Sequence, residues 1–308
     1  MKRKPYRYLF YLGLRLLQAI ALWMPRGTAL ALARTIGRFA FGVAHREREK
    51  TLTHLTHAFG EEKTPAEIFK LAEGVFLHYA QAAVDVLRFP RWTREEIDRL
   101  VEWDESLTLF DPVLAQGKGA ILLTAHLGNW ELMGAFLRLH GYPGTVVARR
   151  IYYEKFNKVL LDMRSKVTLK TIYQDAPARE YLKALRQNQI LGILADQDVD
   201  RLDGIFVPFF GRPAHTPTSP VKLALASGAP LVPAFLVRVG ERYRLLVERP
   251  IYVEMGINKE ETIREYTERW SQIVEAKIRA FPEQWAWMHP RWKTAIPSPQ
   301  TVQTVLND

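Results

Sequence analysis

The chain has 308 residues, of which 48% are hydrophobic and 25% charged, a composition typical of a globular protein with a sizeable core. It has no cysteine, which excludes disulfides, thiolate nucleophiles and cysteine-based zinc sites. The net charge of +10 is concentrated in residues 1–50, which carry eleven Lys/Arg and only two Asp/Glu. These charges alternate with long apolar faces that a nucleic-acid-binding arm does not need, so no nucleic-acid partner is expected.

Two basic amphipathic helices are predicted at the N-terminus, over residues 6–24 and 28–44, with Pro25 and Gly27 between them. Polar and basic side chains share one stripe of each helix: Lys4, Arg7, Tyr11, Arg15 and Gln18, then Arg34, Arg38 and His45. Such helices suit an anionic membrane surface. The first helix would be about 28 Å long, near the ~30 Å of a bilayer core. Because Arg15 would cost roughly 2.5–3.5 kcal/mol at the bilayer centre, interfacial docking is favoured over a spanning helix or a core helix.

The remaining chain divides into a helical part and an alternating part. Helices are predicted over residues 45–60 and 66–87, and a capping box at Thr93 starts a shorter one. Beyond Gly119, strands alternate with helices. The predicted strands are 120–125, 145–148, 190–195, 205–209, 230–237 and 243–247, and the predicted helices are 131–139, 153–166, 177–187, 217–227 and 259–280. This order predicts an α/β fold with a mostly parallel central sheet flanked by helices.

Three segments follow from this pattern. Residues 1–44 are predicted to be a membrane-interacting helical segment, residues 45–296 the α/β domain, and residues 297–308 a polar tail.

The most informative motif is His126-Leu127-Gly128-Asn129-Trp130-Glu131, which lies between a predicted strand and a predicted helix. Open α/β sheets place their sites at such strand ends. Asn129 is predicted to cap the helix and to lie among the substrate-binding residues. His126 can act as a general base for an attacking alcohol, with Glu131 as the carboxylate that fixes its tautomer and stabilises the imidazolium. The bare H-x4-E pattern is common by chance, but the full motif at this junction favours the catalytic interpretation.

Several other chemistries lack support in the sequence. It contains no G-x-S-x-G elbow, H-E-x-x-H, P-loop or G-x-G-x-x-G motif. A serine hydrolase, a zinc protease, an NTPase and a dinucleotide enzyme are therefore not indicated, and neither a metal site nor a cofactor is expected.

Further motifs in the same order along the chain give a resemblance to the late acyltransferases of lipid A biosynthesis, the lauroyl and myristoyl transferase family. More broadly, the chain is similar to glycerolipid acyltransferases with an H-x4-D/E motif. The matching blocks after HLGNWE are Thr145–Arg150, Met163–Lys166, Leu194–Asp198, Phe206–Thr216, Gly228–Pro233 and Pro282–Thr294.

The resemblance implies transfer of a fatty acyl group from a thioester, on acyl carrier protein or coenzyme A, to a hydroxyl of a lipid A-type glycolipid. It also implies a place on the cytoplasmic face of a bacterial inner membrane, held by a monotopic surface or one N-terminal helix. A thioester needs no covalent enzyme intermediate. It does need a base for the alcohol and positive charge near the developing oxyanion and the acceptor phosphates.

The same resemblance implies roles for five basic and acidic residues of this chain. Arg149 and Arg150 would bind phosphate or carbonyl groups, as would Arg164. Asp196 and Asp198, which follow a predicted strand, would position Arg164 or the acceptor, although a turn role is equally compatible with their place.

Two alternatives stay open at this point. The acceptor could be another lipid, such as an ornithine lipid, a lysophospholipid or a phosphoinositol mannoside. The chain could also be a catalytically silent membrane-binding protein, although such a protein would not need to keep Glu131.

Overall fold

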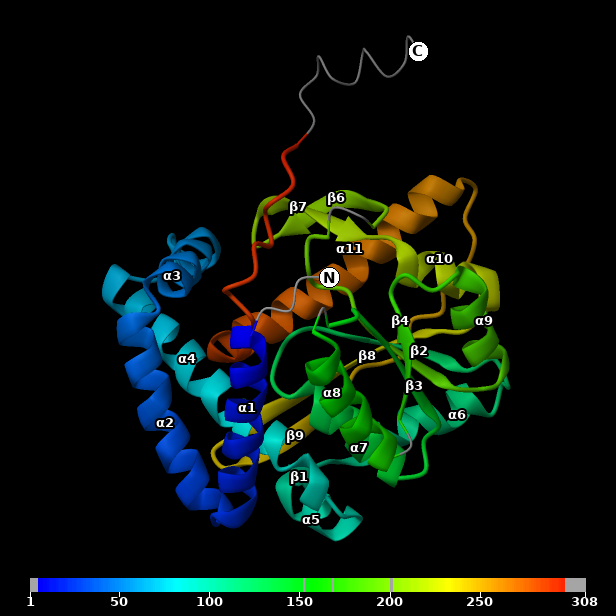
Figure 1. Ribbon diagram of the computed structural model, residues 1–308. Helices are drawn as coiled ribbons and strands as arrows, with labels where there is room; N and C mark the ends of the chain where they lie inside the picture. Colours follow the sequence, from blue (N-terminus) through cyan, green and yellow to red (C-terminus); the bar gives the residue numbers. More distant parts are fainter. Residues whose placement is uncertain (1–4, 152, 168, 200–201, 297–308) are drawn as a thin grey trace.

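The computed structural model describes residues 5–151, 153–167, 169–199 and 202–296 (Figure 1). The predicted tail 297–308 and Lys4 of the predicted stripe lie outside the described residues. The first hundred residues are mainly helical, as predicted. Their helices are α1 (Pro5–Trp23), α2 (Arg26–Val43), α3 (His45–Phe59), α4 (Pro65–Leu87), the 3-10 turn η1 (Phe89–Arg91) and α5 (Arg94–Leu100). Both α4 and α5 begin with a capping box, in which Thr64 pairs with Glu67 and Thr93 with Glu96.

The later helices alternate with strands. They are η2 (Glu105–Leu109), α6 (Phe110–Leu114), α7 (Trp130–Leu139), α8 (Glu154–Lys166), α9 (Ala178–Arg186), α10 (Ser219–Ser227), α11 (Lys259–Ala280) and η3 (Pro282–Gln284). The strands are β1 (Val101–Glu102), β2 (Ala120–Thr124), β3 (Gly144–Ala148), β4 (Lys170–Tyr173), β5 (Ile190–Leu194), β6 (Gly204–Phe209), β7 (Arg212–Pro217), β8 (Leu231–Val239) and β9 (Arg242–Val247).

Within the described residues, seven strands form one sheet in the order β1-β9-β8-β2-β5-β3-β4. Every neighbouring pair is parallel except the hairpin of β8 and β9. The prediction of a mostly parallel α/β sheet is confirmed. The strand order matters for the site because β5 lies between β2 and β3, although it follows both in the sequence.

Three details of the predicted alternation were wrong. The strand predicted at 205–209 does not join the central sheet, because β6 pairs with β7 in a separate antiparallel hairpin. Residues Arg212–Pro217 extend along that hairpin, so α10 begins at Ser219 instead of 217. The strand β4 was not predicted, because its four residues form a half-exposed sheet edge with a weak apolar pattern.

Helices cover both faces of the sheet (Figure 1). Ile121 and Leu123 of β2 contribute to the core formed with α4, α10 and α11. Leu122, the residue between them, contributes to the opposite core beside α7 and α8. Because side chains alternate along a strand, a strand buried on both faces must be apolar throughout, which explains the uninterrupted apolar run of β2.

The N-terminal helices pack on α4 along a narrow face and expose a broad apolar one. Gln18 is the buried polar residue of α1, and its side-chain amide donates to the carbonyl oxygen of Leu87 at 3.4 Å. The exposed large apolar residues of α1 and α2 are Tyr8, Leu9, Phe10, Leu12, Leu16, Leu17, Ile20, Trp23, Leu32, Ile36, Phe39 and Val43. None of the helices described here combines the length and apolarity needed to cross a bilayer.

Candidate active site

The carboxyl ends of β2 and β5 bring His126 and Asp196 together. The two strands are parallel neighbours, and Thr124 pairs with Leu194. His126 and Asp196 each lie two residues beyond that pair, so the register places them side by side. The Nδ1 atom of His126 lies 2.9 Å from one carboxylate oxygen of Asp196, and the other oxygen accepts the backbone N–H of His126 at 2.9 Å.

Asp196 is almost completely buried and is held in its ionised form. Its second carboxylate oxygen also accepts the indole N–H of Trp285 at 2.7 Å. Burial alone would raise the pKa of Asp196, but the charge of a protonated His126 and these hydrogen bonds hold it below its usual range. An ionised partner assigns the proton to Nδ1 of the neutral imidazole, which leaves the Nε2 lone pair available as a base.

The backbone around His126 is fixed from three directions. Its carbonyl oxygen accepts the hydroxyl of Tyr79 at 2.8 Å and the backbone N–H of Ala286 at 3.1 Å. Two residues later, Gly128 has a φ of +67°, and a Cβ there would lie 2.0 Å from the carbonyl oxygen of Leu236. The loop therefore needs glycine for its backbone conformation and for the space around it.

Glu131 does not hold His126 in the way predicted. Its carboxylate pairs with Arg164, whose Nε donates at 3.0 Å and Nη2 at 2.5 Å, and both side chains are about one-tenth exposed. Arg164 also donates to the hydroxyl of Thr171 at 3.3 Å. The two acids have thus exchanged their predicted partners: Asp196 holds the histidine, and Glu131 holds the arginine. Since β5 is inserted between β2 and β3, sequence spacing alone could not reveal this exchange.

Two other predicted substrate-binding residues make their hydrogen bonds within the protein. Asn129 is buried: its side-chain oxygen caps α7 by accepting from Leu132, and its NH2 group donates to Tyr243. The predicted cap is confirmed, and the structure places this side chain with the cap and not with the described cavity lining. The carboxylate of Asp198 accepts from the backbone of Lys293 and from the backbone and hydroxyl of Thr294. Asp198 lines the cavity and anchors the backbone of Lys293 and Thr294 there.

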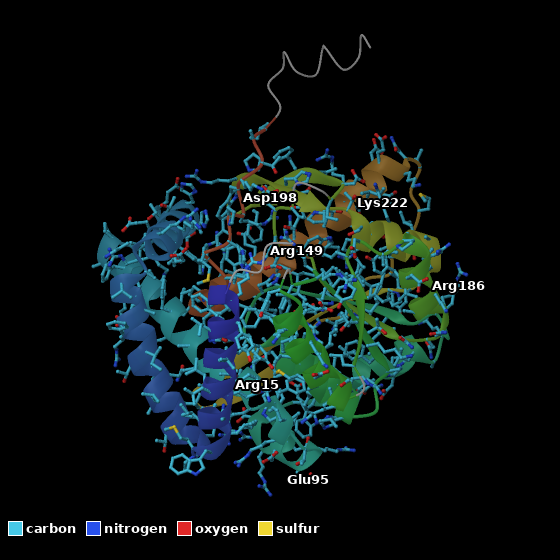
Figure 2. All side chains as sticks on the ribbon, viewed as in Figure 1. Arg15, Glu95, Arg149, Arg186, Asp198 and Lys222 are labelled. Atoms are coloured by element: carbon cyan, nitrogen blue, oxygen red, sulfur yellow. The ribbon has the colours of Figure 1, made fainter. Side chains whose placement is uncertain are left out.

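Arg149 and Arg150 lie where predicted, beyond the end of β3, and both are exposed. The guanidinium of Arg150 stacks over the ring of Tyr173, 3.9 Å from its centroid. Both arginines line the same cavity as His126, Glu131 and Arg164. Figure 2 labels Arg149 and Asp198, which both belong to this cavity's lining.

The cavity has a volume of about 860 Å³ and runs between α7 and the sheet. Its polar end carries His126, Arg149, Arg150, Arg164, Lys293 and His289. Its other end is mainly apolar, and its lining includes Leu122, Met133, Leu137, Tyr142, Val146, Leu169, Ile190 and Gly192. Arg138 also lines this end, where its Nη1 donates to the carbonyl oxygen of Tyr142 at 3.0 Å. A cavity with one polar end and one apolar end suits an amphiphilic ligand.

Three residues that the sequence did not assign to the site contribute to it. Trp285 and Tyr79 hold Asp196 and His126, and the ring of His289 lies 5.9 Å from that of His126. Burial and the nearby His126 lower the pKa of His289, so this ring stays neutral. The block Pro282–Thr294 carries the family resemblance in the sequence. It does not reveal that the indole of Trp285 contacts Asp196, just beyond the end of β5.

Comparison with known proteins identifies the family of the chain. The family of bacterial lipid A biosynthesis acyltransferases matches residues 2–294. Phosphatidylinositol mannoside acyltransferase of Mycobacterium tuberculosis strain H37Rv is 28% identical over 216 residues, which are 68% of this chain and 66% of the relative, so the match spans about two thirds of that protein. The enzyme of the same name from Mycolicibacterium smegmatis is 25% identical over 289 residues, 91% of this chain and 89% of the relative. Lipid A biosynthesis lauroyltransferase of Escherichia coli K12 is 30% identical over 209 residues, 64% of each chain.

Proposed function

Because the chain belongs to the bacterial lipid A biosynthesis acyltransferase family, we propose that it transfers a fatty acyl group from a thioester to a hydroxyl of a membrane glycolipid, with His126 as the general base. The observation that carries the proposal is the contact between His126 and Asp196. It leaves Nε2 available for the reaction, in the same cavity as Arg149, Arg150 and Arg164.

The reaction balances with these groups alone. The acceptor hydroxyl oxygen attacks the thioester carbonyl carbon while its proton moves to Nε2 of His126, and Asp196 stabilises the resulting imidazolium. The carbonyl oxygen gains negative charge, which the cationic end of the cavity stabilises. The tetrahedral intermediate collapses by breaking the C–S bond. The imidazolium then gives its proton to the departing thiolate, which restores the neutral base.

Glu131 and Arg164 act together in this proposal. Arg164 is anchored by two hydrogen bonds to Glu131, so it offers a fixed positive charge instead of a mobile one. Their pair joins α7 to α8 at the cavity wall. Arg149 and Arg150, which are exposed at the same end, suit the phosphate groups of a donor or acceptor.

The acyl chain of the donor would occupy the apolar end of the cavity. Carrier protein and coenzyme A both present the thioester on a phosphopantetheine arm, so the basic end of the cavity suits either. We keep a lipid A-type glycolipid as the first acceptor and a phosphatidylinositol mannoside as the second, because relatives named for each are similar to this chain.

The exposed apolar surface of α1 and α2 supports docking on a membrane, and in this proposal the protein docks on the cytoplasmic face. This surface lies beside the site: Lys155, at the start of α8, has its ammonium 4.2 Å from the ring centroid of Tyr8 on α1. The loop of Arg149 and Arg150 immediately precedes α8. A protein docked through α1 would therefore hold the cavity entrance close to lipid headgroups.

The test is direct acyl transfer. Purified protein is incubated with each glycolipid and with a donor whose acyl chain is radiolabelled, a thioester of either acyl carrier protein or coenzyme A. The His126→Ala variant serves as the matched control. The proposal expects a labelled acylated lipid that His126→Ala makes at least ~10²-fold more slowly. Equal transfer by a folded His126→Ala protein would overturn the base assignment, and no transfer from any donor would overturn the function.

A further inference from the structure

The middle of the central strand β5 carries a glycine, Gly192, that the backbone does not require. It is buried between β2 and β3 and pairs with Leu122 on one side and Val146 on the other. It is not among the glycines with positive φ. Glycine weakens a strand interior, and where no turn or bulge calls for it, it marks a place where something approaches the backbone closely.

The protein itself leaves space at this position. A Cβ on Gly192 would lie 3.4 Å from a methyl of Val146 and 3.8 Å from the carbonyl oxygen of Thr145, which are ordinary contacts. Gly134, which also lines the cavity, differs, since a Cβ there would lie 2.9 Å from Leu169. The missing side chain of Gly192 is therefore explained by the cavity that it lines and not by crowding from the fold.

Strand register gives the depth of Gly192 in the cavity. It is level with Leu122, which precedes His126 by four residues, so it lies about 13 Å from the base at ~3.3 Å per residue. The next cavity-lining pair, Gly144 and Ile190, lies two residues deeper, at about 20 Å. A bilayer core of ~30 Å holds two layers of lipid chains, so one chain spans about 15 Å. The end of such a chain would reach just past Gly192.

We propose that Gly192 determines which acyl-chain length the enzyme accepts, by leaving the passage open between the middle and the deep end of the cavity. The proposal rests on the function proposed above, and it concerns the donor's chain. The acyl chain would pass across the bare backbone of Gly192, beneath α7, and end just past it, facing the deep end that Leu169, Tyr142 and Ile190 line. A side chain at position 192 would narrow the passage and favour shorter chains.

The test measures chain-length preference for the full-length enzyme and its variants. Thioester donors from octanoyl to octadecanoyl are compared at subsaturating concentration, so that the ratio of kcat/KM between donors is read directly. Gly192→Ala and Gly192→Val should shift the optimum stepwise to shorter chains. For Gly192→Val, the wild-type optimum donor should lose roughly 10- to 100-fold relative to a donor several carbons shorter.

Two further variants separate this effect from general damage to the sheet. Leu169→Ala enlarges the deep end and should shift the optimum toward longer chains. Leu191→Met conserves volume on the opposite face of β5, where Leu191 belongs to the other core, and should leave the chain-length profile unchanged.

The possible outcomes distinguish the two proposals. If the wild-type protein transfers no acyl group from any donor, the proposed function fails. If it transfers acyl groups and Gly192→Ala, Gly192→Val and Leu169→Ala keep the wild-type chain-length profile, the assignment of Gly192 is overturned while the function stands. If Gly192→Val does not fold, the opposite shifts expected of Gly192→Ala and Leu169→Ala decide the question.

Discussion

The carboxylate of Asp196 holds His126 at two points, the ring Nδ1 and the backbone N–H, each at 2.9 Å. One contact orients the imidazole and the other fixes the residue that carries it. The same carboxylate would therefore position the base and stabilise its protonated form, although it lies 70 residues away in the sequence.

Replacing Asp196 with asparagine should separate these two roles. The oxygen of the introduced amide could still accept the backbone N–H, but the NH2 group of that amide would favour the wrong tautomer of His126. We expect kcat to fall about 10²- to 10⁴-fold. Steady-state acyl transfer with a saturating donor measures this, and circular dichroism checks folding. A folded Asp196→Asn enzyme with near wild-type kcat would show that His126 needs no such partner.

The pair of Glu131 and Arg164 should behave as one energetic unit. Breaking a buried ion pair leaves an uncompensated charge, at a cost of about 3–5 kcal/mol in the free energy of unfolding. Glu131→Gln and Arg164→Met should each destabilise, and the double variant should lose less than the two losses combined. Urea unfolding of the four proteins gives the coupling energy. Simple additivity would contradict the direct contact.

His78 should make stability depend on pH. Its Nε2 lies 3.3 Å from the carbonyl oxygen of Gly128, and burial, with the nearby Arg238, lowers its pKa from 6.5 to about 3. The unfolded chain binds the proton first as the pH falls. His78 therefore contributes full stability above about pH 6.5, and this is lost at up to ~1.4 kcal/mol per unit as the pH falls toward 3.

The measurement compares wild type with His78→Gln, which does not titrate. Their difference in unfolding free energy should change between pH 6.5 and roughly pH 4.5, with the wild type losing more. A constant difference over this range would mean that His78 does not titrate as its burial requires.

Two glycines with nearly the same φ should respond differently to alanine. Gly128 has a φ of +67° and almost no space, whereas Gly117 has a φ of +71° and nothing within 4 Å of an added Cβ. Both substitutions cost backbone strain of order 1–2 kcal/mol. Gly128→Ala must also displace the backbone at Leu236, so it should greatly reduce both folding yield and acyl transfer. Similar thermal stability of the two variants would argue against the tight packing of the site loop.

Membrane docking should depend on the apolar surface of α1. Leu9 and Leu16 are 68% and 62% exposed and are seven residues apart, which places them on one helix face. Substituting both with glutamate should move most of the protein into the supernatant when it is sedimented with anionic vesicles. Ile257→Glu, at a fully exposed apolar residue outside the N-terminal helices, is the matched control and should stay bound. Equal sedimentation of both variants would place the docking surface elsewhere.

The sequence predicts those features that are local. The apolar runs of β2 and β5 and the cap at Asn129 follow from patterns of a few residues, and all were confirmed. The sequence also singled out His126 and several charged residues that line one cavity with it in the structure: Glu131, Arg149, Arg150, Arg164 and Asp198. How these side chains pair depends on the order of the strands, which local patterns do not contain. The separate hairpin was missed because only β6 was predicted as a strand. Its partner β7 contains two prolines and little apolar pattern, so the sequence gives no sign of a strand there.

The shared register of β2 and β5 has a consequence for how such a site can change over time. Because parallel strands in one sheet meet residue by residue, deleting one residue from β5 would shift the acid by about 3.3 Å and turn alternate side chains to the opposite face. Asp196 and His126 would then no longer be in contact, even if the protein still folded. Insertions in the connecting loops would leave both strands aligned. Natural variation in length should therefore collect in the connections, while the lengths of these two strands stay constant.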